Sequence, residues 1–318
     1  MDIKETTLSY PSHDGVSQIY ALVWEPQPAS TQAPLRGIIQ IIHGVAEHGG
    51  RYRDLARFLT DEGFVVCVND HVGHGRSVSN PSQLGHMPGT AGKAILVSDV
   101  HALRLRMSQQ YPDLPYIMLG HSMGSFILRV YLTHHAEGLT GAILSGTAQQ
   151  PRALSAFGHA LSRVLASTRG ETYRSGFLDG MGLGAFAKTI QNARTPFDWI
   201  CTDPAVVDAY IQDPACGFML TVGGYTTLLD MTGQMVTLAC AQAVPKDLPL
   251  LFICGSEDPV GNHSKAVQSA VNQYKKAGLT NVTLKVYPGL RHEILNEPTK
   301  QTVYQDILSW LNPPLNTA

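Results

Sequence analysis

One serine lies at the centre of the most informative motif in this 318-residue sequence, Gly120-His121-Ser122-Met123-Gly124. Apolar residues from Tyr116 precede the motif, and a second apolar run, Phe126 to Leu132, follows it. This pattern predicts a buried strand, a sharp turn and a helix, with Ser122 at the turn and glycines that let strand and helix approach closely. A hydroxyl exposed at a helix N-terminus can attack a carbonyl carbon. We therefore interpret Ser122 as the candidate nucleophile.

A serine nucleophile needs a histidine to accept its proton and a carboxylate to orient that histidine. At a strand-to-helix turn of this kind, the partners follow in the order acid then histidine, each after its own strand. Asp258 comes after the apolar run 249–254, and His292 comes after the run 282–287. Of the thirteen histidines, only His292 follows the last predicted strand. Asp258 is therefore the candidate acid and His292 the candidate base, with Glu257 as an alternative acid.

Attack on a carbonyl creates a negative oxygen that needs two N–H donors. The residue after the nucleophile, Met123, is expected to supply one of them. The other is expected from the loop His43-Gly44-Val45, which follows the apolar run 37–42, and we assign it to Val45.

The elements that must position these residues alternate between strands and helices. Runs that are apolar throughout are typical of strands covered on both faces of a parallel sheet. Such runs occur at 37–42, 64–68, 116–119, 142–145, 249–254 and 282–287, and helical patterns occupy 51–62, 91–110, 265–277 and 302–311. Alternation over residues 6–25, around a turn signal at 12–15, predicts an N-terminal β-hairpin. The sequence thus predicts an α/β fold with a mostly parallel, doubly wound sheet.

Residues 147–244 interrupt this alternation, because they contain helical pieces and no strand pattern. Helices are expected near 154–165, 205–211 and 225–240, with a mobile glycine-rich loop at 170–184. Each helix taken singly is equally consistent with a core helix. The length of the block favours a helical lid inserted into one domain that spans residues 1–318.

Apolar residues of this block, and two residues beside the predicted donor loop and the nucleophile, are candidates for binding the substrate. The candidate substrate-binding residues are Gly44, His121, Leu154, Phe157, Leu161, Phe177 and Leu178, with Met181 and Leu183 as further lid residues.

Composition excludes several classes of function. A net charge of −2 without a block of Lys or Arg argues against nucleic acid as a partner. Five widely spaced cysteines predict reduced thiols in a cytoplasmic protein, and the N-terminus lacks the apolar core of a signal peptide. No run approaches the ~18–20 apolar residues that span a bilayer. Gly89-Thr90-Ala91-Gly92-Lys93 lacks the full phosphate-binding pattern, so no nucleotide cofactor is expected.

Five blocks together resemble the monoacylglycerol lipase/lysophospholipase branch of the α/β-hydrolases (the serine aminopeptidase-like, hydrolase 4 family), over about residues 6–312. The blocks are HGVAEHGGRY (43–52), NDHVGHGRS (69–77), GHSMGS (120–125), GSEDPVG (255–261) and YPGLRHEILNE (287–297). The resemblance implies a Ser122–Asp258–His292 triad, a Val45/Met123 oxyanion hole, a lid over an acyl pocket, and no cofactor. The expected protein is a serine ester hydrolase acting on small lipid-like substrates of the monoacylglycerol or lysophospholipid kind.

Other functions remain open at this point. The same triad would serve an amide or peptide hydrolase of the aminopeptidase type, and a hydrolase fold can also act as a non-catalytic binding protein. A zinc site at histidines 43, 48, 71 and 74 is a weaker alternative, because their spacing matches no recognised helix pair and no cysteine is close. We expect these histidines to be hydrogen-bonded loop residues at the rim of the site, and no metal is expected. Acyl-chain length, head group, oligomeric state and transient contact of the lid with a membrane surface stay undetermined.

Overall fold

The strands form one mostly parallel sheet in the order β1-β2-β4-β3-β5-β6-β7-β8. The computed structural model describes residues 3–26 and 34–315. The strands are β1 (Lys4–Pro11), β2 (Gln18–Glu25), β3 (Gly37–Ile42), β4 (Phe64–Asn69), β5 (Tyr116–His121), β6 (Gly141–Ser145), β7 (Leu250–Gly255) and β8 (Val282–Tyr287). The β1–β2 hairpin pairs antiparallel with β4, and the strands from β4 to β8 are parallel. The predicted hairpin and α/β sheet are therefore confirmed.

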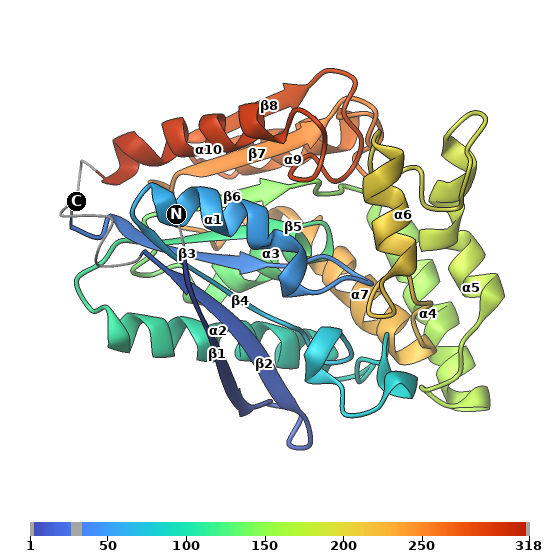
Figure 1. The fold of residues 1–318 in the computed structure, drawn as a ribbon. Coiled ribbons are helices and arrows are strands. Elements are labelled where there is room, and N and C mark those ends of the chain that lie inside the picture. The colour runs from blue at the N-terminus through green and yellow to red at the C-terminus, as the bar shows by residue number, and fades with distance from the viewer. Residues whose placement is uncertain (1–2, 27–33, 316–318) are drawn as a thin grey trace.

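Side chains of β3 alternate between two hydrophobic layers, one on each face of the sheet. Ile38 and Ile42 join the core beneath one set of helices, whereas Ile39 and Ile41 join the core on the opposite face. The first face is covered by α2 (Gly92–Gln110), α3 (Met123–His135) and α9 (Lys265–Lys276), and the second by α1 (Arg53–Asp61) and α10 (Lys300–Leu315). Figure 1 shows α2 and α10 on opposite sides of the sheet. Burial on both faces explains why β3 is apolar except for Gln40.

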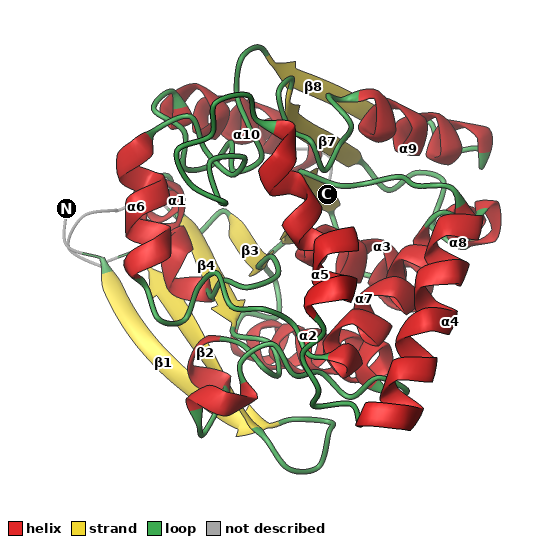
Figure 2. Cartoon of the chain, turned by 90° about the vertical axis from the view of Figure 1, so that its right-hand side faces the viewer, coloured by secondary structure: helices red, strands yellow, loops and turns green. Residues whose placement is uncertain are grey.

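Helices fill the block between β6 and β7, where the described residues contain no strand. They are α4 (Arg152–Arg169), α5 (Gly176–Met181), the 3-10 segment η4 (Leu183–Thr189), α6 (Pro204–Gln212), α7 (Val222–Met235) and α8 (Leu238–Gln242). In Figure 1, α4, α5 and α6 lie at the end of the sheet toward which the parallel strands point, and Figure 2 views that end. They are therefore placed over the loops that follow the strands.

Two details of this block differ from the sequence prediction. The expected helix 225–240 is divided into α7 and α8, because the Thr237 hydroxyl caps α8 by accepting a hydrogen bond from the Cys240 N–H at 3.2 Å. The expected loop 170–184 contains α5, which begins where the Ser175 hydroxyl accepts from the Leu178 N–H at 3.2 Å. Helix α7 is largely buried and packs on α2, α3 and α4. It therefore belongs to the main helical layer, while the role of the block as a lid stays a prediction.

None of the helices among the described residues combines the length and the apolar character needed to cross a membrane.

Candidate active site

Ser122 lies between the end of β5 and the start of α3, in a backbone conformation that few non-glycine residues adopt. Its φ is 50° and its ψ is −120°. The N–H of Ser122 donates to the carbonyl of Ser145 at 2.9 Å, and the hydroxyl of Ser125 donates to the carbonyl of Ser122 at 2.6 Å. These bonds hold both sides of the strained residue. The turn predicted at Ser122 is therefore present.

Two glycines allow this turn to pack closely against the sheet. A Cβ atom on Gly124 would overlap the carbonyl group of Ile42 in β3, and a Cβ atom on Gly120 would meet the carbonyl of Gly124. Helix α3 therefore contacts β3 and β5 backbone to backbone. This contact sets the height of Ser122 above the end of the sheet.

Asp258 and His292 follow β7 and β8, and the structure brings them together. The Nδ1 atom of His292 lies 3.0 Å from Oδ1 of Asp258, and both side chains are buried. Because a carboxylate only accepts, Nδ1 carries the proton and Nε2 is left as an acceptor. This Nε2 is buried and has no partner among the described residues. Glu257, the alternative acid, is exposed, with its carboxylate 3.9 Å from Nδ1 of His263.

The charge of Asp258 changes the protonation of His292. Burial of the ring would lower its pKa, but the negative charge of Asp258 and the hydrogen bond to it act in the opposite direction, and the pKa of His292 is raised. His121, whose ring centre lies 4.8 Å from that of His292, behaves differently. Burial and the neighbouring His292 lower the pKa of His121 to about 4, so this ring is neutral at neutral pH.

The turn after Asp258 is a feature that the sequence did not predict. Asn262, His263 and Ser264 have φ values of 47°, 51° and 68°, in the left-handed region. The N–H of His263 donates to the backbone carbonyl of Asp258 at 2.9 Å. Such a conformation costs roughly 1–2 kcal/mol per residue. The fold therefore accepts strain immediately beside the candidate acid.

The loop after β3 is held by hydrogen bonds that leave the N–H of Val45 without an acceptor among the described residues. The N–H of Gly44 donates to Oε1 of Glu47, and Nδ1 of His43 donates to the carbonyl of Gly44 at 2.7 Å. In a planar trans peptide the Gly44 carbonyl and the Val45 N–H point in opposite directions, so fixing one fixes the other. Among the described residues, no acceptor bonds the N–H of Val45 or of Met123. Both N–H groups could receive a ligand oxygen.

Buried histidines join this loop by hydrogen bonds to the loop that follows β4. The Nε2 atom of His43 accepts from the N–H of His71 at 3.0 Å, and Nε2 of His71 donates to the carbonyl of His43 at 3.2 Å. Burial lowers the pKa of both rings and that of His74, the last to about 4. Both ring nitrogens of His43 are thus occupied by hydrogen bonds. These contacts count against the zinc site considered from the sequence.

A cavity of about 420 Å³ includes Ser122 and Val45 in its wall. Of the predicted substrate-binding residues, Leu154, Phe157 and Leu178 also line this cavity. Other apolar and aromatic side chains complete most of the wall: Phe126, Met181, Leu183, Phe186, Trp199, Tyr225, Leu228 and Leu229. The candidate nucleophile therefore faces a mainly apolar space.

Four predicted substrate-binding residues do not line the cavity. Leu161 is partly buried and packs against the main core. The side chain of Phe177 is 67% exposed on the outer side of α5. Gly44 and His121 lie behind the wall, where an added Cβ on Gly44 would be 3.2 Å from the Cβ of Ser122. Apolar character alone did not show which helix residues face the cavity, which face the core and which face solvent.

Trp199 is a site residue that the sequence prediction missed. Its ring centre lies 5.1 Å from that of His292, and its carbonyl accepts a hydrogen bond from the His292 N–H at 3.4 Å. It also lines the cavity. The sequence feature that could have identified Trp199 is a large aromatic residue in a polar part of the inserted block.

Comparison with known families gives a match over most of the chain. The family model described as serine aminopeptidase, S33 (Hydrolase_4) matches residues 33–299. The chain belongs to this family. The predicted membership of the hydrolase 4 family is therefore confirmed.

Curated relatives and solved structures agree with this assignment. The monoacylglycerol lipase of Mycolicibacterium smegmatis is 30% identical over 306 residues, which cover 95% of each chain. The human monoglyceride lipase is 27% identical, over 94% of this chain and 88% of the relative. A thermostable carboxyl esterase from Bacillus coagulans superposes with a TM-score of 0.90 at 33% identity, over 99% of this chain and 100% of that one. The predicted α/β-hydrolase fold and serine hydrolase class are confirmed.

The close contact of Gly124 with Ile42 in this hydrolase 4 protein leads to a stability prediction. Gly124→Ala should lower the free energy of unfolding by about 1–3 kcal/mol, because the new methyl group forces β3 and α3 apart. Urea unfolding followed by circular dichroism measures this change. Gly180→Ala in α5 is the matched control, since nothing lies within 4 Å of its added Cβ. Equal stability of the two variants would contradict the prediction.

Proposed function

We propose that this protein is a serine hydrolase that cleaves monoacylglycerol-like esters through a covalent acyl-enzyme. One observation carries the proposal: the candidate nucleophile Ser122 and the free N–H of Val45 lie at a mainly apolar cavity of about 420 Å³. An apolar cavity of this kind suits an acyl chain, and a hydroxyl beside N–H donors suits attack on its carbonyl. The monoacylglycerol and monoglyceride lipases among the relatives support the same substrate class.

In the proposed acylation step, Nε2 of His292 accepts the proton of the Ser122 hydroxyl while Oγ bonds to the ester carbonyl carbon. The carbonyl oxygen becomes negative and accepts hydrogen bonds from the N–H groups of Val45 and Met123. Asp258 holds the Nδ1 proton and stabilises the imidazolium. The carbon–oxygen bond to the alcohol then breaks, and His292 donates its proton to the departing alcohol.

Deacylation repeats these steps with water as the nucleophile. His292, neutral again, accepts a proton from a water molecule that attacks the acyl-enzyme carbonyl. The same N–H groups stabilise the negative oxygen. Ser122 leaves with the proton from His292, which releases a fatty acid and restores the enzyme.

The residues around the cavity favour a neutral head group. Among the described residues that line it, none carries a charged side chain. A lysophospholipid would bring a phosphate that normally binds arginine or lysine, and a peptide with a free N-terminus would bring an ammonium group that needs a carboxylate. Neither group has such a partner at the wall. We therefore rank monoacylglycerol-like esters above lysophospholipids and above peptides or amides.

Ser122→Ala tests the nucleophile directly. It should reduce hydrolysis of a monoacylglycerol by about 10³-fold or more, because no acyl-enzyme can form. The measurement is the release of fatty acid, with the melting temperature as a check that the fold is intact. Wild-type turnover by this variant would refute the proposal, and wild-type cleavage of amino-acid amides in place of esters would favour the peptidase alternative.

The pH profile tests the proposed base. His292 must be neutral at Nε2 to accept a proton, so kcat/KM should fall as the pH drops through its raised pKa, above the ordinary value of about 6.5. Asp258→Asn removes the charge that raises this pKa. Its acid limb should move to lower pH, with a plateau reduced by about 10⁴-fold. An acid limb that stays in place in Asp258→Asn would contradict the assigned pair.

Exposed apolar residues beside the cavity suggest how the lipid substrate reaches it. We propose that residues 147–244 are a lid insertion in a single domain, in which α4, α5 and α6 cover the strand ends while α7 packs in the main helical layer. We also propose that α4 and α5 touch lipid surfaces transiently. Phe157 on α4 and Phe177 on α5 are 60% and 67% exposed. Exposed aromatic side chains of this kind insert at the boundary between head groups and acyl chains.

Phe177→Ser tests the lipid contact without changing the cavity wall. Binding to phosphatidylcholine vesicles in a sedimentation assay should weaken about fivefold, while hydrolysis of soluble p-nitrophenyl acetate stays unchanged. Val16→Ser is the matched control, because Val16 is 87% exposed in the turn of the N-terminal hairpin, outside the inserted block. Equal vesicle binding by the two variants would count against contact through α5.

The cysteines support a proposed cytoplasmic location. All five are free thiols and all five are buried. Free cysteines are common in reducing compartments, where disulfides rarely persist.

A further inference from the structure

The inserted helical block holds the loop that carries Val45. Ala46, the next residue, has a left-handed φ of 54°. Its carbonyl accepts two hydrogen bonds from the block, one from the Tyr210 hydroxyl at 2.8 Å and one from the Gly217 N–H at 3.0 Å. Because a left-handed alanine costs free energy, the loop needs outside contacts to keep this conformation. Tyr210 and Gly217 supply such contacts.

Residues on either side of Tyr210 and Ala46 strengthen this connection. The guanidinium of Arg51 lies 4.8 Å from the ring centre of Tyr210, and Arg51 also pairs with Glu47, whose other oxygen accepts from the Gly44 N–H. The same cation bonds both carboxylate oxygens of Glu293, the residue after His292. Tyr210 therefore packs on the cation that connects the Val45 loop to the loop of the candidate base.

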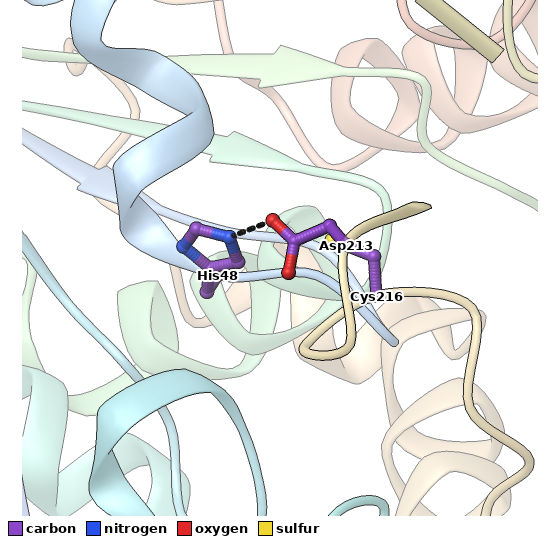
Figure 3. Close-up of side chains that lie close together, drawn as sticks. All are labelled: His48, Asp213 and Cys216. Atoms are coloured by element: carbon purple, nitrogen blue, oxygen red, sulfur yellow. Dashed lines mark hydrogen bonds and ion pairs between the residues drawn. The ribbon is translucent and has the colours of Figure 1, made fainter. Parts of the chain in front are cut away.

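A third contact between the Val45 loop and the inserted block involves His48, Asp213 and Cys216, shown in Figure 3. Their ligand atoms lie within 4.8 Å of one another, which raises the possibility of a metal site. However, Nδ1 of His48 accepts from the Gly50 N–H at 3.1 Å, so Nε2 carries the proton and donates to Asp213 at 2.9 Å. A metal-bound histidine instead donates from its second nitrogen. Burial also raises the pKa of Cys216. The cluster is therefore a hydrogen-bonded contact between loop and block.

We propose that Tyr210 is a positioning residue for the Val45 N–H donor. The inference rests on the proposed function, since it concerns the oxygen that becomes negative during acyl transfer. His43 and Glu47 hold the peptide groups before Val45, and the Tyr210 hydroxyl holds the carbonyl of Ala46, the residue after Val45. Loss of that hydroxyl leaves the Gly217 N–H as the remaining donor to the Ala46 carbonyl, so the strained residue after Val45 is held less firmly and the Val45 N–H is less precisely aligned with the substrate oxygen. The inserted block thus completes the oxyanion hole without contributing a donor to it.

Tyr210→Phe tests this role, because it removes the hydroxyl and keeps the ring over Arg51. With p-nitrophenyl butyrate, kcat should fall about fivefold at unchanged KM, which corresponds to one hydrogen bond of ordinary strength. The inhibition constant of an alkylboronic acid should rise by a similar factor. Such acids form a tetrahedral adduct on a serine hydroxyl, so their affinity reports the oxyanion hole and not the ground state.

Tyr10→Phe is the matched control, because its hydroxyl also donates to a backbone carbonyl, that of Asp99 at 2.9 Å, in the buried core beside α2. It should leave kcat and boronic acid affinity unchanged. Unchanged kcat in Tyr210→Phe, or a rise in KM alone, would overturn the positioning role. A fall in kcat explained entirely by fewer active sites in a titration would overturn it too. Failure of the proposed function appears separately, as full turnover in Ser122→Ala.

Discussion

The close backbone contact of α3 with β3 and β5 is the constraint on which the site depends. Without Cβ atoms at Gly120 and Gly124, the helix starts directly over the sheet, and Ser122 takes a strained conformation with a positive φ above the strand ends. The same approach places the N–H of Met123 at the start of the helix, where no intrahelical acceptor exists. Nucleophile and donor therefore result from one packing arrangement. Local strain at the serine is the cost of that packing.

Parallel strands then determine which loops can meet this serine. Because β3, β5, β7 and β8 are parallel, the segments that follow them emerge at one edge of the sheet. Asp258 and His292 are 34 residues apart in the chain, yet their side chains share a buried hydrogen bond. Burial strengthens this interaction. Desolvation is the largest single effect on His292 and lowers its pKa, but the charge of Asp258, the hydrogen bond to it and the nearby Glu293 and Glu47 together outweigh desolvation and raise the pKa. A surface pair would be screened by water and would shift the pKa of His292 less.

Sequence patterns predicted the parts of this protein that depend on period and order. Continuous apolar runs identified the strands, and the order of Ser122, Asp258 and His292 followed from where those strands end. The cavity-lining residues of the inserted block were harder to predict from the sequence. Leu161 and Phe177 are as apolar as Leu154, yet Leu161 packs on the core and Phe177 faces solvent. The left-handed turn at residues 262–264 was also hidden, since none of its residues is a glycine. Helix faces and backbone strain depend on tertiary contacts that no local pattern records.

The oxyanion loop shows most clearly what tertiary contacts add. Its sequence, His43-Gly44-Val45, indicated a donor, but nothing local says which N–H stays free. Side-chain contacts decide this: Glu47 accepts from the Gly44 N–H, and His43 donates to the Gly44 carbonyl, which directs the Val45 N–H. Tyr210 donates to the carbonyl of Ala46, the next residue. Two of these partners come from the loop itself, and one comes from the inserted block. The inserted block, which forms much of the cavity wall, is therefore joined by hydrogen bonds to the backbone of the loop that carries the proposed donor. No residue of α6 lines the cavity, yet a substitution in α6 that removes the contact with Ala46 would loosen the support of this loop, so the constraint on Tyr210 comes from the loop and not from contact with the acyl chain.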